Sequence, residues 1–181
     1  MLLAVDVSFR NSGYSIWRSG TLVGCGVVQT EKCRDRNMYA FAQDAIEVAG
    51  AFAAFCAMVD AIGIKALLVE LPHGSQSAAA AKCSGYAIGI MACLSTRYGL
   101  PMEYVTPQRV KKIASGSATA TKAEMIEKAC ALVDVHRQPS GRSTIYMCAG
   151  ARFPEGKFEH LADSICLYHA ARETNVVKMF G

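Results

Sequence analysis

Two acidic residues each end a short run of apolar residues, where an unpaired charge is costly. Asp6 follows the apolar residues 2 to 5, and Glu70 follows the apolar residues 66 to 69. A carboxylate in such a place normally needs a partner such as a cation. Continuous apolar runs of this length predict strands buried on both faces of a sheet, and ligands gather beyond the carboxyl ends of such strands. We therefore expect the two carboxylates to converge on one site.

A third carboxylate and a histidine lie close together near the C-terminus. His160 and Asp163 are three residues apart, so they share one face of a predicted helix. A set of three carboxylates with one histidine suits Mg²⁺ or Mn²⁺, which keep several waters and bind phosphate oxygens, whereas zinc favours more His or Cys. Together with Asp6 and Glu70, these residues predict a metal site for phosphoryl chemistry.

Taken singly, each of these residues also has a purely structural explanation. Asp6 could form a turn at a strand end, and Glu70 could be an ion-pair partner. Asp163 could be favoured near the positive N-terminus of a helix, and His160 could be a surface or capping residue. The hypothesis of a metal site therefore depends on all four side chains lying together.

Apolar periodicity predicts the elements that position these residues. Strands are expected at 2–8, 12–17 and 21–29, joined by short turns as an antiparallel meander, and then at 66–70 and near 102–105. Helices are expected at 41–62, 76–98, 107–114, 122–133 and 159–172. This order predicts an α/β fold, with a mixed five-stranded sheet and helices on both faces. The turn-rich residues 137–157 are expected to form a long basic loop.

Length and composition favour one folded domain spanning residues 1–181. The apolar fraction of 52% and the charged fraction of 19% exclude a disordered chain. The 8 cysteines have no C-x-x-C spacing, which favours reduced thiols. Asp6 breaks the opening apolar run too early for a secretory leader, and the apolar run 49–59 is too short to cross a bilayer. We expect a protein of the cytoplasm, bacterial or of a phage-infected host, with no membrane partner.

Basic residues are concentrated in one part of the chain. The chain has a net charge of +4. Within residues 97–157 alone, the excess of Lys and Arg over Asp and Glu is larger than that. Such asymmetry can mark a surface that binds a polyanion, or it can be an ordinary solvated surface.

The predicted helix 76–98 is rich in small residues. It contains four consecutive alanines at 78–81, then Gly85, Ala87 and Gly89. Small side chains allow a second helix to approach closely, so we expect a homodimer joined through this helix.

Four motifs, taken in order, resemble the RuvC family of Holliday-junction resolvases, within the ribonuclease H-like superfamily. The first is Leu2–Asp6 followed by Asn-Ser-Gly-Tyr-Ser at 11–15. The second is Glu70 with the small-residue helix after it, the third is the basic segment 108–112 with Gly116 and Lys122, and the fourth is His160 with Asp163. Val7-Ser8 replaces the family's usual Pro-Gly, and extra length precedes His160. Both features resemble divergent, phage-type members.

The resemblance implies a structure-selective DNA endonuclease that resolves Holliday junctions or related branched DNA. It implies two Mg²⁺ or Mn²⁺ ions per site, held by Asp6, Glu70, His160 and Asp163, and hydrolysis that leaves 5′-phosphate and 3′-hydroxyl ends. Lys122 is expected to act near the scissile phosphate. The expected DNA contacts are His73, Arg109, Lys111, Lys112, Lys122, Arg137, Arg142 and Arg152.

Three alternatives stay open. A ribonuclease H or flap nuclease of the same fold class would lack junction selectivity, and a monomer would favour it. A non-catalytic junction-binding protein would lack one of the four predicted ligands, and none is missing. A nucleotide-binding half-domain of the actin and sugar-kinase type would need phosphate-binding glycines after Asp6, which this sequence lacks.

Overall fold

The computed structural model describes the whole chain except residues 34, 36, 72, 73, 75, 76 and 142. Two of the predicted DNA contacts, His73 and Arg142, therefore lie outside the described residues.

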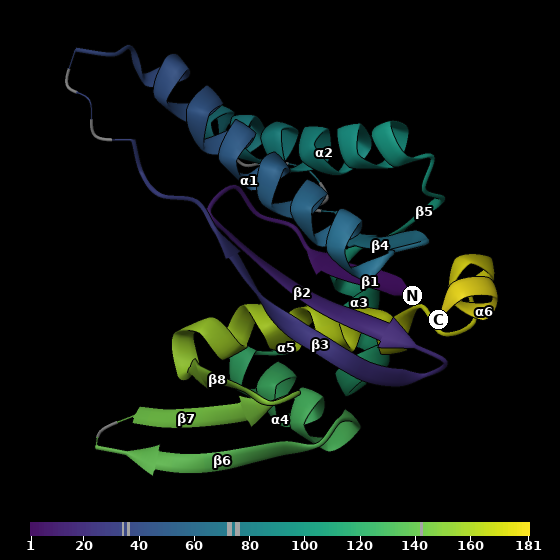
Figure 1. Cartoon of the computed structure of the whole chain (residues 1–181). Coiled ribbons are helices and arrows are strands. Elements are labelled where there is room, and N and C mark those ends of the chain that lie inside the picture. Colours follow the sequence, from purple (N-terminus) through teal and green to yellow (C-terminus); the bar gives the residue numbers. More distant parts are fainter. Residues whose placement is uncertain (34, 36, 72–73, 75–76, 142) are drawn as a thin grey trace.

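A five-stranded sheet runs through the centre of the molecule (Figure 1). Its strands are β1 (Leu2–Asp6), β2 (Asn11–Arg18), β3 (Thr21–Gln29), β4 (Ala66–Glu70) and β5 (Met102–Val105). They lie in the order β3-β2-β1-β4-β5. The first three form an antiparallel meander, whereas β4 is parallel to β1 and β5 is parallel to β4. The predicted mixed five-stranded sheet is confirmed.

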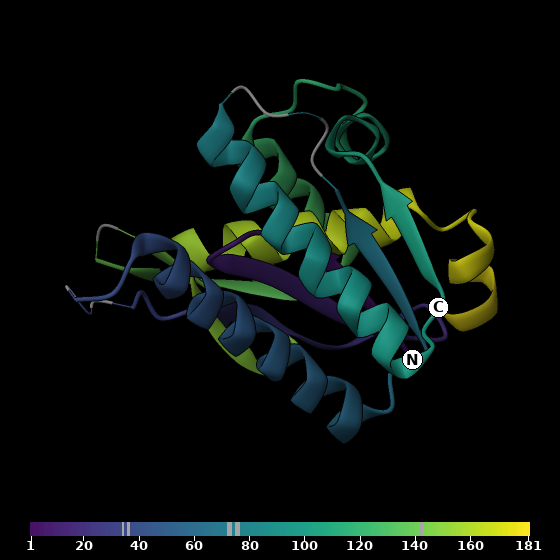
Figure 2. The same ribbon diagram turned by 90° about the horizontal axis from the view of Figure 1, so that it is seen from above.

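Helices cover both faces of this sheet, as Figures 1 and 2 show. One face carries α1 (Ala40–Ile62) and α2 (Ala78–Tyr98), and the other carries α3 (Pro107–Ser115), α4 (Lys122–Leu132) and α5 (Glu155–Ala170). A short α6 (Asn175–Phe180) ends the chain. Alternate side chains of β1 enter the two cores: Leu3 and Val5 pack with α1 and α2, whereas Leu2 and Ala4 pack with the opposite layer. This double burial explains the continuous apolar run before Asp6.

Helices α1 and α2 are long and apolar enough to cross a membrane, judged by length and composition alone. The sequence-based expectation considered only the run 49–59 and did not foresee this. Both helices lie on the sheet and contribute residues to its core, including Ala51, Phe55, Met91 and Leu94. A helix covering a sheet meets the same apolar criterion, so the criterion is weak support for a membrane span.

The prediction of a long loop at 137–157 is wrong. This part of the chain forms a second, antiparallel sheet of β6 (Val135–Ser140), β7 (Ser143–Cys148) and β8 (Ala151–Pro154), and α5 begins directly after it. Gly141 does lie in a turn, with its backbone in the left-handed conformation, but the residues before it form a strand, and Phe153 to Gly156 span the end of β8 and the start of α5. Buried side chains of this second sheet pack on α5, where the Tyr146 and Phe158 rings stack with centroids 4.2 Å apart. That long-range contact has no local sequence signal.

Candidate active site

The ends of two neighbouring strands bring the first two carboxylates together. In the parallel ladder between β1 and β4, Asp6 and Glu70 are direct partners. Each is the last residue of its strand and only partly buried, after four fully buried apolar residues. Because both strands are fixed by the core, the two side chains start from adjacent backbone positions at the same end of the sheet.

Helix α5 approaches this end closely because β2 has a glycine there. Gly13 is the ladder partner of Asp6, and a Cβ on Gly13 would lie only 1.9 Å from the carbonyl oxygen of His160. Two residues further along β2, the Ser15 hydroxyl donates a 3.0 Å hydrogen bond to the Ser164 carbonyl. Gly13 and Ser15 therefore fix α5 against the sheet and set His160 beside Asp6.

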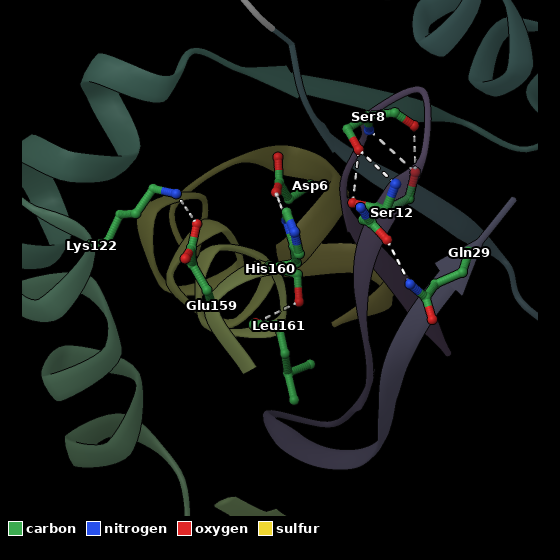
Figure 3. A network of polar contacts seen from close by, with 10 residues as sticks. Asp6, Ser8, Ser12, Gln29, Lys122, Glu159, His160 and Leu161 are labelled. Atoms are coloured by element: carbon green, nitrogen blue, oxygen red, sulfur yellow. Dashed lines mark hydrogen bonds and ion pairs between the residues drawn. The ribbon is translucent and has the colours of Figure 1, made fainter. Parts of the chain in front are cut away.

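His160 and Asp6 face one another across this contact (Figure 3), with 3.9 Å between Nδ1 and Oδ2. The Asp6 carboxylate raises the pKa of His160, and the negative charges of Glu159 and Asp163 act in the same direction. Partial burial of the imidazole opposes this effect. The histidine therefore lies within a strongly negative environment.

Glu70 and Asp163 both hold a proton far more tightly than an ordinary carboxylic acid. Burial raises the pKa of Glu70 to about 9, and the charges of Asp6 and Asp163 add to the rise. Burial likewise raises the pKa of Asp163 to about 7, with further contributions from Asp6 and Glu159. Lys111 lowers both values, so its ammonium lies close enough to be felt by both carboxylates. A bound cation would stabilise these buried carboxylates, because it would offset their mutual repulsion.

The donor set at this site fits a divalent cation. Three carboxylates and one imidazole provide the oxygen-rich coordination that Mg²⁺ and Mn²⁺ prefer. In the part of the chain that the structure describes, no three His, Cys, Asp or Glu side chains are close enough to enclose an ion as they stand. Binding would therefore require the side chains of Asp6, Glu70 and Asp163 to move closer together.

A serine-based turn follows Asp6 in place of Pro-Gly. The Ser8 hydroxyl donates to the Asn11 carbonyl (2.8 Å), and the Ser12 hydroxyl donates to the Ser8 carbonyl (2.9 Å). The Asn11 N–H in turn donates to the Ser8 hydroxyl, and Gln29 on β3 donates to the Asn11 side chain (Figure 3). These bonds close the β1–β2 connection tightly, so the backbone after Asp6 is held in place without Pro-Gly.

Two of the predicted lysines lie beside the carboxylates. Lys111 on α3 is half-buried, and its charge acts on Glu70 and Asp163. Lys122, the first residue of α4, forms an ion pair with Glu159. Arg109 and Lys112 are exposed on α3.

The predicted arginines of the second sheet do not form one group. Arg137 makes a two-pronged ion pair with Glu127 of α4, at 2.7 and 2.8 Å, and lies over the Tyr146 ring. Arg152 pairs with Met147, one position further along β7, and so projects from the opposite face of the sheet. Arg137 therefore joins the second sheet to α4, whereas Arg152 forms no ion pair with the residues that the structure describes.

Sequence reasoning missed three residues that build the site. Glu159 directly precedes the last motif, but nothing in the sequence shows its ion pair with Lys122. Gly13 was noted only as part of a motif, although its missing side chain admits α5. Ser15 bonds to a residue 149 positions away, a separation that no local pattern can reveal.

Comparisons with known proteins agree on the fold. A structure of RuvC from Thermus thermophilus in complex with a Holliday junction substrate superposes with a TM-score of 0.65 at 17% identity, covering 93% of this chain and 90% of that one. A second Thermus thermophilus RuvC structure gives 0.63 at 16% identity, covering 97% and 96%. No family model matches the sequence, and no curated protein sequence matches it. The chain thus has the ribonuclease H-like fold of RuvC, and the resemblance stated from its motifs is confirmed at the level of fold.

Proposed function

We propose that this protein is a metal-dependent endonuclease that cuts branched DNA, with the four-way junction as its principal substrate. One observation carries the proposal: Asp6, Glu70, His160 and Asp163, predicted from three separate motifs, converge at one end of a RuvC-like sheet. The related structure that contains a Holliday junction supports the choice of substrate.

The proposed chemistry is phosphodiester hydrolysis to 5′-phosphate and 3′-hydroxyl ends. Two divalent ions held by Asp6, Glu70, His160 and Asp163 would activate the attacking water and stabilise the leaving oxygen. The chain's own cations act beside them. Lys111, whose charge already reaches Glu70 and Asp163, compensates the negative charge of the site, and Lys122 stabilises the charge that develops on the scissile phosphate.

The protein acts as a homodimer in this proposal, so that two sites nick two strands. An apolar groove of about 380 Å³ lies between α1 and α2 and is lined by residues including Ala49, Phe52, Gly85 and Gly89. A Cβ at Gly85 or Gly89 would meet no atom of the same chain within 4 Å. Gly85 and Gly89 are thus open to a second copy, whereas Ala87 is buried in the core of its own chain. Burying this part of α2 would also cover the apolar surface of α1.

The DNA-binding surface in this proposal surrounds the four predicted ligands. Lys111 and Lys122 contact the phosphates nearest the cut, Arg109 and Lys112 extend the contact along α3, and Arg152 adds a contact from the second sheet. We place the protein in the cytoplasm, where chromosomal or phage DNA is its substrate.

Cleavage of a panel of synthetic substrates tests this function. Purified protein is incubated in Mg²⁺ or Mn²⁺ with a four-way junction, a flap, a linear duplex and an RNA–DNA hybrid, with Glu70→Gln as the matched inactive control. We expect the junction to be cut fastest. Equal cutting of flap or hybrid would favour the alternative nuclease without junction selectivity. Tight junction binding with no cleavage in either metal would favour a non-catalytic binding protein.

A further inference from the structure

Glu159 is an additional carboxylate at the edge of the proposed active site. It is not one of the four residues proposed to bind the metal. It precedes Asp163 by four residues on α5, so the two side chains are neighbours on one helical face. Its side chain is only 24% exposed. Its charge reaches the site, because it raises the pKa of both His160 and Asp163.

The partner of Glu159 is Lys122. Figure 3 shows the two side chains pointing toward one another, from α5 and α4, beside the Asp6–His160 contact. The backbone of Lys122 is fixed, because the preceding Thr121 caps α4 in a reciprocal arrangement with Glu124. The lysine side chain is 77% exposed and has no other ion-pair partner among the residues that the structure describes. Its long chain would otherwise sample many conformations in solvent.

A negative charge in this place repels a phosphate and adds to a site that already carries too many carboxylates. Among the residues that the structure describes, its one ion-pair partner is Lys122. Its evident effect is to hold one ammonium group at a defined point beside Asp163. A cation that is already in place when the transition state forms stabilises it without a further cost of reorganisation.

We propose that Glu159 is a positioning residue that holds the Lys122 ammonium where the scissile phosphate binds. The proposal rests on the nuclease function above. It makes the ion pair a catalytic arrangement in which Lys122 contacts the substrate and Glu159 acts through it.

Single-turnover cleavage of saturating four-way junction in Mg²⁺ tests the pairing. Lys122→Ala and Glu159→Gln should each slow the reaction by roughly tenfold or more, and the double variant should be no slower than Lys122→Ala alone. Junction binding measured in EDTA should change by less than about twofold for Glu159→Gln, because its effect is on rate. The matched control is the exposed pair of Lys178 in α6 and Glu173 just before that helix, 2.9 Å apart, where Lys178→Ala and Glu173→Gln should leave the rate unchanged.

A second measurement needs neither metal nor DNA. Acetic anhydride labelling, quantified residue by residue with mass spectrometry, should acylate Lys122 several times faster in Glu159→Gln than in the wild type. Glu173→Gln should leave Lys122 labelling unchanged.

Each contrary result overturns the proposal. A wild-type or faster rate for Glu159→Gln would mean that the carboxylate only repels the substrate. Losses that multiply in the double variant would mean that the two residues act independently, and unchanged Lys122 labelling would mean that no ion pair holds the lysine. Failure of the wild type to cut any junction would instead contradict the proposed nuclease function, and the labelling would still decide whether Glu159 holds Lys122.

Discussion

Asp6 and Glu70 are direct partners at the carboxyl ends of two neighbouring parallel strands. The core on both faces of the sheet fixes these strands, so the separation of the two carboxylates is set by the ladder and not by a loop. Helix α5 then brings His160 and Asp163 to the same place through a contact that only Gly13 permits. Two strands of the sheet and one helix therefore position all four of the predicted ligands.

The raised pKa values of Glu70 and Asp163 predict an unusual stability profile for the metal-free protein. The folded chain binds these protons more tightly than the unfolded chain, with pKa values of about 9 and about 7 against ordinary values of 4.5 and 3.8. Their contribution to folding is therefore complete at low pH and is lost as pH rises through about 7 and then about 9. In EDTA, the melting temperature should fall from about pH 5.5 to about pH 8.5.

Divalent metal should reverse this loss, since a cation replaces the protons. Millimolar Mg²⁺ or Mn²⁺ should raise the melting temperature more at about pH 8.5 than at about pH 5.5. Glu70→Gln should flatten the metal-free profile, because it removes the group with the largest shift. A metal-free melting temperature that climbs across this range would contradict the electrostatic description of the site.

Alanine substitutions at Gly13 and Gly50 should change the free energy of unfolding in opposite directions. Gly13→Ala places a methyl group within 1.9 Å of the His160 carbonyl and should lower the free energy of unfolding by about 2 kcal/mol or more, because α5 must move. Gly50→Ala, in the interior of α1 with no atom near its Cβ position, should raise that free energy by up to about 1 kcal/mol.

Urea unfolding monitored by circular dichroism measures both changes. Gly13→Ala should also slow cleavage, since His160 is displaced from Asp6. An alanine at position 13 that left stability unaltered would show that α5 does not depend on this close approach.

The open face of α2 predicts a dimer that a bulky residue can split. Gly89→Trp should give a monomer at micromolar concentration, because the indole would occupy the space into which a second copy packs. Gly50→Trp, on α1 but outside the groove lining, is the matched control and should remain dimeric. Size-exclusion chromatography with light scattering gives the mass. A monomeric wild type would refute the proposed assembly.

Alanine substitutions of Arg137 and Arg152 should impair different properties of the protein. Arg152→Ala should weaken junction binding and reduce the slope of log affinity against log salt by roughly one unit, because one phosphate contact is lost. Arg137→Ala should mainly lower the melting temperature, by no more than a few degrees, because this side chain joins β6 to Glu127 on α4. Fluorescence anisotropy over a salt series separates the two. A wild-type salt slope for Arg152→Ala would remove the second sheet from the DNA-binding surface.

The sequence predicted the central sheet because its strands have strong local signals. Apolar residues run without interruption before Asp6 and Glu70, since both strands are buried on two faces. The helices likewise have clear boundaries, such as Gly63 and Gly99, which end α1 and α2 in the left-handed conformation. These features are encoded within a few residues, so they can be recognised without a structure.

The second sheet and the finer structure of the site could not be predicted because they depend on distant contacts. Strands β6 to β8 are short and largely polar on one face, and they are stabilised where Tyr146 and Phe153 pack against α5 and its surroundings. The ion pair of Lys122 with Glu159 likewise joins two helices, α4 and α5, between which the whole second sheet lies in the sequence. Composition marked residues 137–157 as basic, but only the fold separates a structural Arg137 from an exposed Arg152.

Mapping the cuts in a four-way junction labelled at each of its strand ends tests the central claim most directly. In Mg²⁺ or Mn²⁺, the wild type should make paired, symmetrically placed nicks that DNA ligase can reseal, which requires 5′-phosphate and 3′-hydroxyl ends. Asp6→Asn, Glu70→Gln and Asp163→Asn should each reduce this cutting by roughly a hundredfold or more while retaining junction binding, because each isostere preserves shape and removes a ligand charge. Paired resealable nicks that disappear in all three variants are the predicted result. An intact junction in both metals, or cutting that persists in the variants, would contradict the assignment of these carboxylates as the catalytic site.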